Sequence, residues 1–152
     1  PWLHCTVQSM RNTADVSKTE IDALLDTARS ALSSFAPFMT SPGAPAMWGE
    51  AVVFDLSPSP ELVELHQVVV GVSCTVLDVE APARFVPHVT FSYAHADGDA
   101  ATTVEALRDP AFVLPPFAVQ RLLLLDVLRE PGPERGWYSW DVVGEIALPS
   151  RA

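Results

Sequence analysis

Two of the four histidines stand in the same short motif, which places an imidazole and a hydroxyl two residues apart. The first copy is His4-Cys5-Thr6 and the second is His88-Val89-Thr90. Residues i and i+2 of a β-strand point to the same face, so each copy would present its His and Thr side by side and turn its middle residue toward the core. The next positions on these faces, Gln8 and Ser92, are polar as well. The two motifs therefore predict two similar polar strand faces.

Two imidazoles on opposite sides of a bound phosphate could catalyse an in-line displacement. One removes a proton from the attacking water or hydroxyl group, and the other protonates the leaving oxygen. Threonine hydroxyls can donate hydrogen bonds to the non-bridging phosphate oxygens. This chemistry needs no metal, and the sequence has no carboxylate-rich or Cys/His cluster with the spacing of metal ligands, so we expect neither a metal nor a cofactor. The competing interpretation is coincidence, because a His and a Thr on one exposed strand face are common in structural domains.

Both motifs lie in segments with the alternating pattern of a strand, at residues 2–8 and 86–93. Ser17 with Glu20 has the spacing of a capping box and predicts a helix start, and Ser59 before Pro60 predicts a second helix over residues 61–76. The other expected elements are turns over 33–45, strands over 51–56, 117–128 and 137–148, a short helix over 102–107, and a hairpin loop between the last two strands. Helices and strands that alternate and then close with a hairpin predict an α+β domain with a largely antiparallel sheet.

The composition excludes several classes of protein. Hydrophobic residues make up 49% of the 152 residues, which excludes a disordered chain. The net charge of −10, with Lys18 as the single lysine, argues against tight binding to a long nucleic acid backbone. The longest apolar runs fall short of the roughly 18 residues of a membrane span, and Cys5 and Cys74 cannot form a disulfide framework. We expect a monomeric cytoplasmic protein with no membrane partner and no long duplex nucleic acid as partner.

The sequence resembles the 2H phosphoesterase superfamily, the two-histidine group that includes bacterial 2′-5′ RNA ligases and 2′,3′-cyclic nucleotide phosphodiesterases. The resemblance is carried by WLHCTVQ at residues 2–8, by FVPHVTFSYAHADG at residues 85–98, and by the closing segments LLLLDVLRE and WYSWDVVGEIAL. Two His-x-Thr motifs about eighty residues apart, each on an apolar strand, form a fairly specific signature. The resemblance extends over nearly the whole chain and is strongest to RNA-ligase-like proteins of high-GC bacteria.

The resemblance implies a bilobal α+β fold with pseudo-twofold symmetry, in which mostly antiparallel sheets flanked by helices surround a central cleft. Each lobe would contribute one His-x-Thr strand. By this resemblance His4 and His88 are the catalytic pair, and Thr6 and Thr90 hold the phosphate. In the family a strand and a helix usually precede the first motif, so residues 1–152 would form a single domain of this type lacking those two elements.

Other polar and aromatic residues could contact the substrate. Gln8 and Ser92 extend the two motif faces, and Trp48 could stack on a base. Tyr93 stands where many members of the family carry a basic residue. Cys5 is expected to point inward and to be unreactive. The hairpin aromatics Trp137, Tyr138 and Trp140 are expected to serve packing rather than recognition.

These observations lead to two hypotheses of different classes. The first is a metal-independent phosphoesterase that hydrolyses 2′,3′-cyclic phosphates of RNA ends or small nucleotides, or runs the same chemistry as a reversible 2′-5′ RNA ligation. The acidic net charge favours a nucleotide or a short RNA terminus as the partner. The alternative is a nucleotide- or RNA-end-binding module without significant turnover. The arrangement of His4 and His88 in space discriminates the enzyme from a domain with coincidental motifs.

Overall fold

The computed structural model describes residues 3–94, 96–109, 113–130 and 137–149. It shows an α+β fold in which the paired strands are antiparallel, as the order of the predicted elements indicated. The helices are α1 (Lys18–Ala31), α2 (Pro60–Leu77) and α3 (Ala100–Leu107), with a 3₁₀ turn at Thr13–Asp15 before α1. The strands are β1 (Phe38–Thr40), β2 (Pro42–Trp48), β3 (Ala51–Leu56), β4 (His88–Tyr93), β5 (Phe117–Val119), β6 (Arg121–Glu130) and β7 (Trp137–Ala147).

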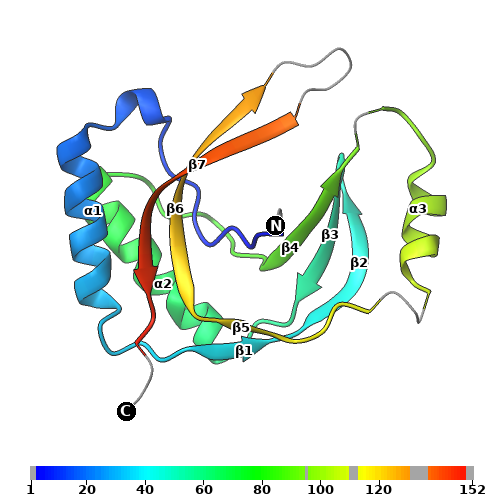
Figure 1. The fold of residues 1–152 in the computed structure, drawn as a ribbon, viewed down its shortest axis with the longest axis horizontal. Coiled ribbons are helices and arrows are strands. Elements are labelled where there is room, and N and C mark those ends of the chain that lie inside the picture. The colour runs from blue at the N-terminus through cyan, green and yellow to red at the C-terminus, as the bar shows by residue number, and fades with distance from the viewer. Residues whose placement is uncertain (1–2, 95, 110–112, 131–136, 150–152) are drawn as a thin grey trace.

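Three sheets divide the molecule into two halves (Figure 1). β2, β3 and β4 form a three-stranded sheet in that order, with α3 packed beside β2. β6 and β7 form a long hairpin, and α1 and α2 lie on its outer side. The short β1–β5 pair connects the two halves at the base of the view. The N-terminal segment runs between the two larger sheets, which places the first motif in the middle of the molecule.

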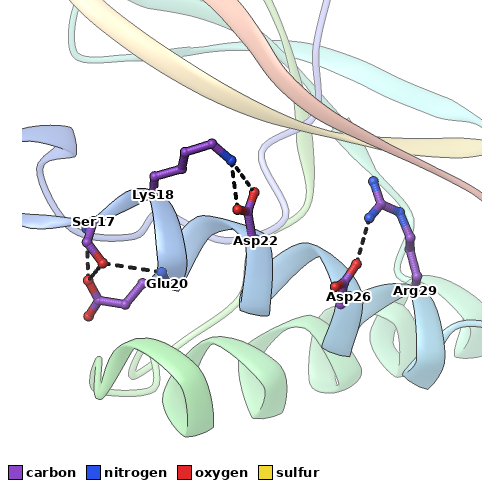
Figure 2. Close-up of polar contacts among 6 residues, drawn as sticks. All are labelled: Ser17, Lys18, Glu20, Asp22, Asp26 and Arg29. Carbon is purple, nitrogen blue, oxygen red and sulfur yellow. Dashed lines mark hydrogen bonds and ion pairs between the residues drawn. The ribbon is translucent and has the colours of Figure 1, made fainter.

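The start of α1 has the capping box that its sequence predicts (Figure 2). The Ser17 hydroxyl oxygen accepts from the Glu20 backbone N–H at 3.3 Å, and the Glu20 carboxylate accepts from the Ser17 backbone N–H at 2.8 Å. Hydrogen bonds from the Ser17 side chain and backbone hold the pKa of Glu20 below its ordinary value. The exposed pairs Lys18–Asp22 and Asp26–Arg29 lie further along the helix, where solvent-exposed ion pairs contribute little to stability.

α2 is the central helix of the structure and begins as predicted, with Ser59 as N-cap and Pro60 in the first turn. Its buried residues include Leu62 and Leu65, which pack in two different core clusters. The helix has 18 residues and, by length and composition alone, is long and apolar enough to cross a membrane. The apolar runs of the sequence had predicted no segment of this kind. α2 packs against α1, and its Val72 and Leu77 belong to a core cluster against which the hairpin residues Leu124 and Ile146 pack. Of the apolar window, 33% is buried inside the structure.

The segment expected to form turns over 33–45 instead contains β1 and the first half of β2. β2 lies at the edge of its sheet, where a proline that cannot donate a ladder hydrogen bond is tolerated. The β2–β3 register shifts between Pro42 and Pro45, which accommodates the two prolines. The proline content of this segment therefore predicted turns, whereas in the structure its second part forms an edge strand.

Two expected strands differ from the structure. The segment over residues 2–8 is not a continuous strand in its described part, because it makes a single bridge to the sheet, at His4. The expected long strand over 117–128 is divided at Gln120, so that β5 pairs with β1 while β6 pairs with β7. The remaining strands and helices lie within a few residues of their expected bounds. The expected loop between β6 and β7 lies outside the described residues.

Candidate active site

The two His-x-Thr motifs lie next to each other and run in opposite directions. His4 forms an antiparallel bridge with Thr90, and the Thr90 backbone N–H donates to the His4 carbonyl oxygen at 3.1 Å. Residues opposite each other in an antiparallel pair share a face, with Cα atoms about 5.5 Å apart at a hydrogen-bonded pair. His4 of the first motif therefore lies beside Thr90 of the second.

The middle residues of both motifs point away from this polar face, as predicted. Val89 is buried in a cluster with Leu56 and Leu62, and Cys5 packs against the same cluster. Burial raises the pKa of the Cys5 thiol, while a hydrogen bond from the His88 backbone partly opposes this rise. A buried thiol with a raised pKa holds little of the reactive thiolate. Through this bond the Cys5 side chain contacts the backbone of the second motif.

A β-bulge in β4 changes which side chains extend the second motif. Val53 pairs with Thr90 and the adjacent Val52 pairs with Ser92, so Phe91 is the extra residue. Val52 and Val53 face opposite sides of β3, and their partners do the same. Ser92 therefore lies on the face opposite to His88 and Thr90, and the expectation that it extends their face is wrong. The alternation that predicted it holds only in an unbulged strand.

The same bulge places Tyr93 on the motif face. Tyr93 pairs with Ala51, which lies on the Val53 side of β3, and Trp48 of β2 pairs with Ala51 on this side as well. Tyr93 lines the cleft described below, whereas Ser92 does not. Trp48 and Tyr93, the two aromatic residues expected to contact the substrate, thus share a sheet face with the second motif.

Backbone contacts orient the ring of His88. Its Nδ1 lies 2.9 Å from the carbonyl oxygen of Val86. Because a carbonyl can only accept, Nδ1 carries a hydrogen in this contact, and in the neutral ring Nε2 is the nitrogen with the free lone pair. The Trp48 ring lies 4.5 Å from the His88 ring and covers it. Nε2 is therefore the atom of His88 that can take or give a proton in the reaction.

The β6–β7 hairpin contributes aromatic residues to the site that the sequence reading assigned to packing. The Trp140 ring meets the His4 ring edge-on, with centroids 5.4 Å apart. The rings of Tyr138 and Tyr93 lie 4.8 Å apart and bring the hairpin into contact with β4. Tyr138 and Trp140 are two residues apart on β7, so the i, i+2 rule already indicated a shared face. Which residues that face meets depends on the tertiary structure.

A cleft of about 1260 Å³ lies between the N-terminal segment and the β6–β7 hairpin and extends to the apolar side chains of α1 and α2. Its lining includes six residues of the site, namely His4, Thr6, Gln8, Tyr93, Tyr138 and Trp140. Thr90 is 5% exposed and, like His88 under Trp48, does not line the cleft itself. The Gln8 side-chain amide donates to the Ser9 carbonyl oxygen at 2.9 Å. Of the predicted site residues, four line this cleft, and three lie on the sheet face that Tyr93 shares: the first set is His4, Thr6, Gln8 and Tyr93, and the second is Trp48, His88 and Thr90.

The chemical groups of the site are those of acid–base catalysis rather than of metal binding. Among the described residues, no group of three or more His, Cys, Asp or Glu side chains is arranged to bind a metal ion. The site offers imidazoles, hydroxyls and aromatic faces. These groups can transfer protons, donate hydrogen bonds to an anion and stack on a base.

Comparison with known proteins relates this arrangement to one family. A family model described as the 2′-5′ RNA ligase superfamily matches residues 1–131. A search of curated protein sequences finds no match. A solved phosphoesterase and E. coli LigT in its apo form are each 18% identical to this chain with a TM-score of 0.66; the alignments cover 98% of this chain and 78% and 77% of those chains. The protein TT0787 of Thermus thermophilus is 13% identical, with a TM-score of 0.70 over 99% of this chain and 80% of that chain.

The structural similarities support the fold, and the family match supports the ancestry. The match spans both motifs and most of the chain, and the solved structures share the arrangement of antiparallel sheets and helices. The chain therefore belongs to the 2′-5′ RNA ligase superfamily of two-histidine phosphoesterases.

Proposed function

We propose that this protein hydrolyses 2′,3′-cyclic phosphates at RNA ends or on small nucleotides, without a metal ion. The observation that carries the proposal is the antiparallel contact of the two motifs through the His4–Thr90 bridge. This contact brings the two motifs together, and in the proposal a phosphate binds between their histidines and threonines. Membership of the superfamily supports an enzyme, and the proposal names its substrate class.

The proposed reaction is an in-line displacement at phosphorus. One histidine takes a proton from a water molecule as the water oxygen forms a bond to phosphorus. The P–O bond to one ribose oxygen breaks, and the other histidine gives that oxygen a proton. The product is a 2′- or 3′-phosphomonoester, and a second proton exchange returns the two imidazoles to their starting states. If a ribose 5′-hydroxyl group takes the place of water, the same steps form a phosphodiester and account for ligation.

The two threonines would stabilise the charge that develops during the displacement. Thr90 lies across from His4, and Thr6 lines the cleft. Hydroxyl donors held in place before the reaction stabilise charge on the non-bridging oxygens at no cost of reorganisation.

The structures of relatives in complex with ligands support a small nucleotide as the substrate. E. coli LigT has been crystallised with 3′-AMP and with phosphate. The LigT chain in the 3′-AMP complex is 19% identical in sequence to this chain, and the two structures superpose with a TM-score of 0.60. 3′-AMP is one of the two possible products of opening 2′,3′-cyclic AMP. In this chain, the exposed rings of Trp48 and Tyr93 on the motif face provide surfaces on which a base could stack.

The test is direct incubation with 2′,3′-cyclic AMP, CMP, GMP and UMP, with the products separated by chromatography and identified by phosphorus NMR. We expect ring opening to a single monophosphate isomer, unchanged by EDTA, and abolished in a His4→Ala, His88→Ala double variant. Activity that vanishes with chelator and returns with a divalent ion would contradict the metal-free mechanism. Tight nucleotide binding without turnover would favour the alternative of a binding module. Ligation is tested in a parallel incubation with two RNAs. One RNA carries a 2′,3′-cyclic phosphate at its end, and the other carries a 5′-hydroxyl group.

A further inference from the structure

His66 of α2 lies behind the two motifs and touches the segments that carry both of them. Its Nδ1 is 2.9 Å from the carbonyl oxygen of Val7, the residue that follows Thr6. Its ring stacks on Phe85, with centroids 3.9 Å apart and planes 6° apart. We propose that His66 is a positioning residue that holds the first His-x-Thr motif in place against the second.

The first motif needs such a support because the sheet holds it at few points. Within the described part of the N-terminal segment, the pairing with the sheet is the single bridge at His4. The backbone therefore lacks the repeated ladder hydrogen bonds that fix the position of a residue inside a sheet. The bond from His66 to Val7 joins residues 59 apart in the chain and anchors the segment one residue beyond Thr6.

The contact with Phe85 connects the same histidine to the second motif. Phe85 lies three residues before His88 and packs against the cluster of Leu56, Leu62 and Val89. Cys5 of the first motif packs against this cluster too. His66 therefore forms a hydrogen bond with the segment of the first motif and stacks on Phe85, which precedes the second motif. A displacement of the His66 ring would change the distance between the two motifs.

The geometry also specifies the proton on His66. The Val7 carbonyl oxygen can only accept a hydrogen bond, so Nδ1 must carry the hydrogen in both the neutral and the protonated ring. The role assigned to His66 is mechanical support, carried by its contacts with Val7 and Phe85. Aromatic stacking and one hydrogen bond make separable contributions, which allows matched variants to distinguish them.

The kinetic test rests on the proposed phosphodiesterase activity and compares three variants. His66→Phe keeps a ring that can stack on Phe85 but removes the donor, and His66→Asn keeps a donor near the position of Nδ1. Gln67→Leu, on the exposed side of the same helix, is the control. We expect His66→Phe to lower kcat by roughly 10- to 100-fold, with KM nearly unchanged, because small misplacements of catalytic groups cost rates of this order. His66→Asn should recover most of kcat, and Gln67→Leu should match the wild type.

A second measurement decides the proposal independently of the activity. Nitrogen-15 NMR of the wild type, at a pH where the ring is neutral, should show His66 as the tautomer protonated on Nδ1. In His66→Phe the amide signals of Thr6 and its neighbours should shift or broaden, and in His66→Asn they should remain close to the wild type. An Nε2-protonated His66, or variants that leave both kcat and the Thr6 region unchanged, would overturn the positioning role. If the wild-type protein shows no turnover but gives these NMR results, the proposed function is rejected and the positioning role of His66 is retained.

Discussion

His4 lies directly across from Thr90, with the Thr90 backbone N–H donating to the His4 carbonyl oxygen at 3.1 Å. This one contact joins two motifs that are far apart in the chain. It also makes this part of the site composite, because the histidine of the first motif lies beside the threonine of the second.

Replacing either threonine by valine keeps shape and strand propensity but removes a donor. We expect Thr6→Val and Thr90→Val each to lower kcat/KM for a 2′,3′-cyclic nucleotide by about 10²–10³-fold, the usual cost of losing a donor to a developing oxyanion. Ser92→Ala is the matched control, since the bulge places Ser92 on the opposite face. Steady-state kinetics on all three variants decide the matter. Equal losses in Ser92→Ala would contradict the assignment of faces.

The two histidines should act as a unit. His4→Ala and His88→Ala should each remove most of the activity, and the double variant should lose little more than the worse single one, because groups that act together are non-additive. One imidazole must be neutral and the other protonated, so kcat/KM should be bell-shaped in pH, with both limbs belonging to the pair. Single variants with near wild-type kcat/KM, or a flat profile from about pH 5 to 8, would show that the pair does not carry the chemistry.

The contact between Tyr93 and Tyr138 should contribute to substrate binding, because it brings two aromatic faces together at the cleft. We expect Tyr93→Leu and Tyr138→Leu to raise KM for cyclic nucleotides several-fold with a smaller effect on kcat, since stacking is worth about 1–3 kcal/mol per base. Phe replacements keep the rings and serve as controls. A double-mutant cycle on KM measures whether the two rings act on the same base. Additive effects would indicate two separate contacts.

The raised pKa of Cys5 predicts a slow reaction with alkylating reagents. In a Cys74→Ser background, iodoacetamide should modify Cys5 much more slowly in the folded protein than in denaturant. Because the pKa is higher in the folded state, the unfolded chain ionises first as pH rises past the ordinary value of 9.0, and the free energy of unfolding should fall there. Cys5→Ala should remove this part of the pH dependence. Fast modification of the folded protein would contradict the inward position.

The capping box of α1 offers a test that is separate from the active site. Ser17→Ala should destabilise the protein by about 1 kcal/mol in chemical unfolding, the usual cost of losing an N-cap. The pKa of Glu20 is lowered in the folded state, so its contribution is present above its ordinary value of 4.5 and is lost as pH falls through the lower folded value. The difference between wild type and Ser17→Ala should therefore shrink in acid. If the difference in free energy of unfolding between the two proteins stays constant down to low pH, the Ser17 cap does not depend on the charge of Glu20.

Local rules sufficed for several features of the site. The period of two along a strand placed His88 and Thr90 on one face of β4, and it predicted that Cys5 packs toward the core, where the structure has it. Cap residues likewise predicted the starts of α1 and α2, because an N-cap bonds to a backbone group only two or three residues away. Such features depend on neighbours in the chain, so residue types and spacing indicate them.

The sequence alone therefore determined the face shared by His88 and Thr90, the helix starts and the α+β class. The tertiary structure decided the rest: the bulge that exchanged Ser92 for Tyr93, the edge position that allowed prolines in β2, and the contacts of Trp140 and Tyr138 with residues of the opposite sheet and segment. His66, too, reaches Val7 across 59 residues. These features arise from register and packing between distant segments, where several pairings satisfy the same alternation and only the complete set of contacts selects one.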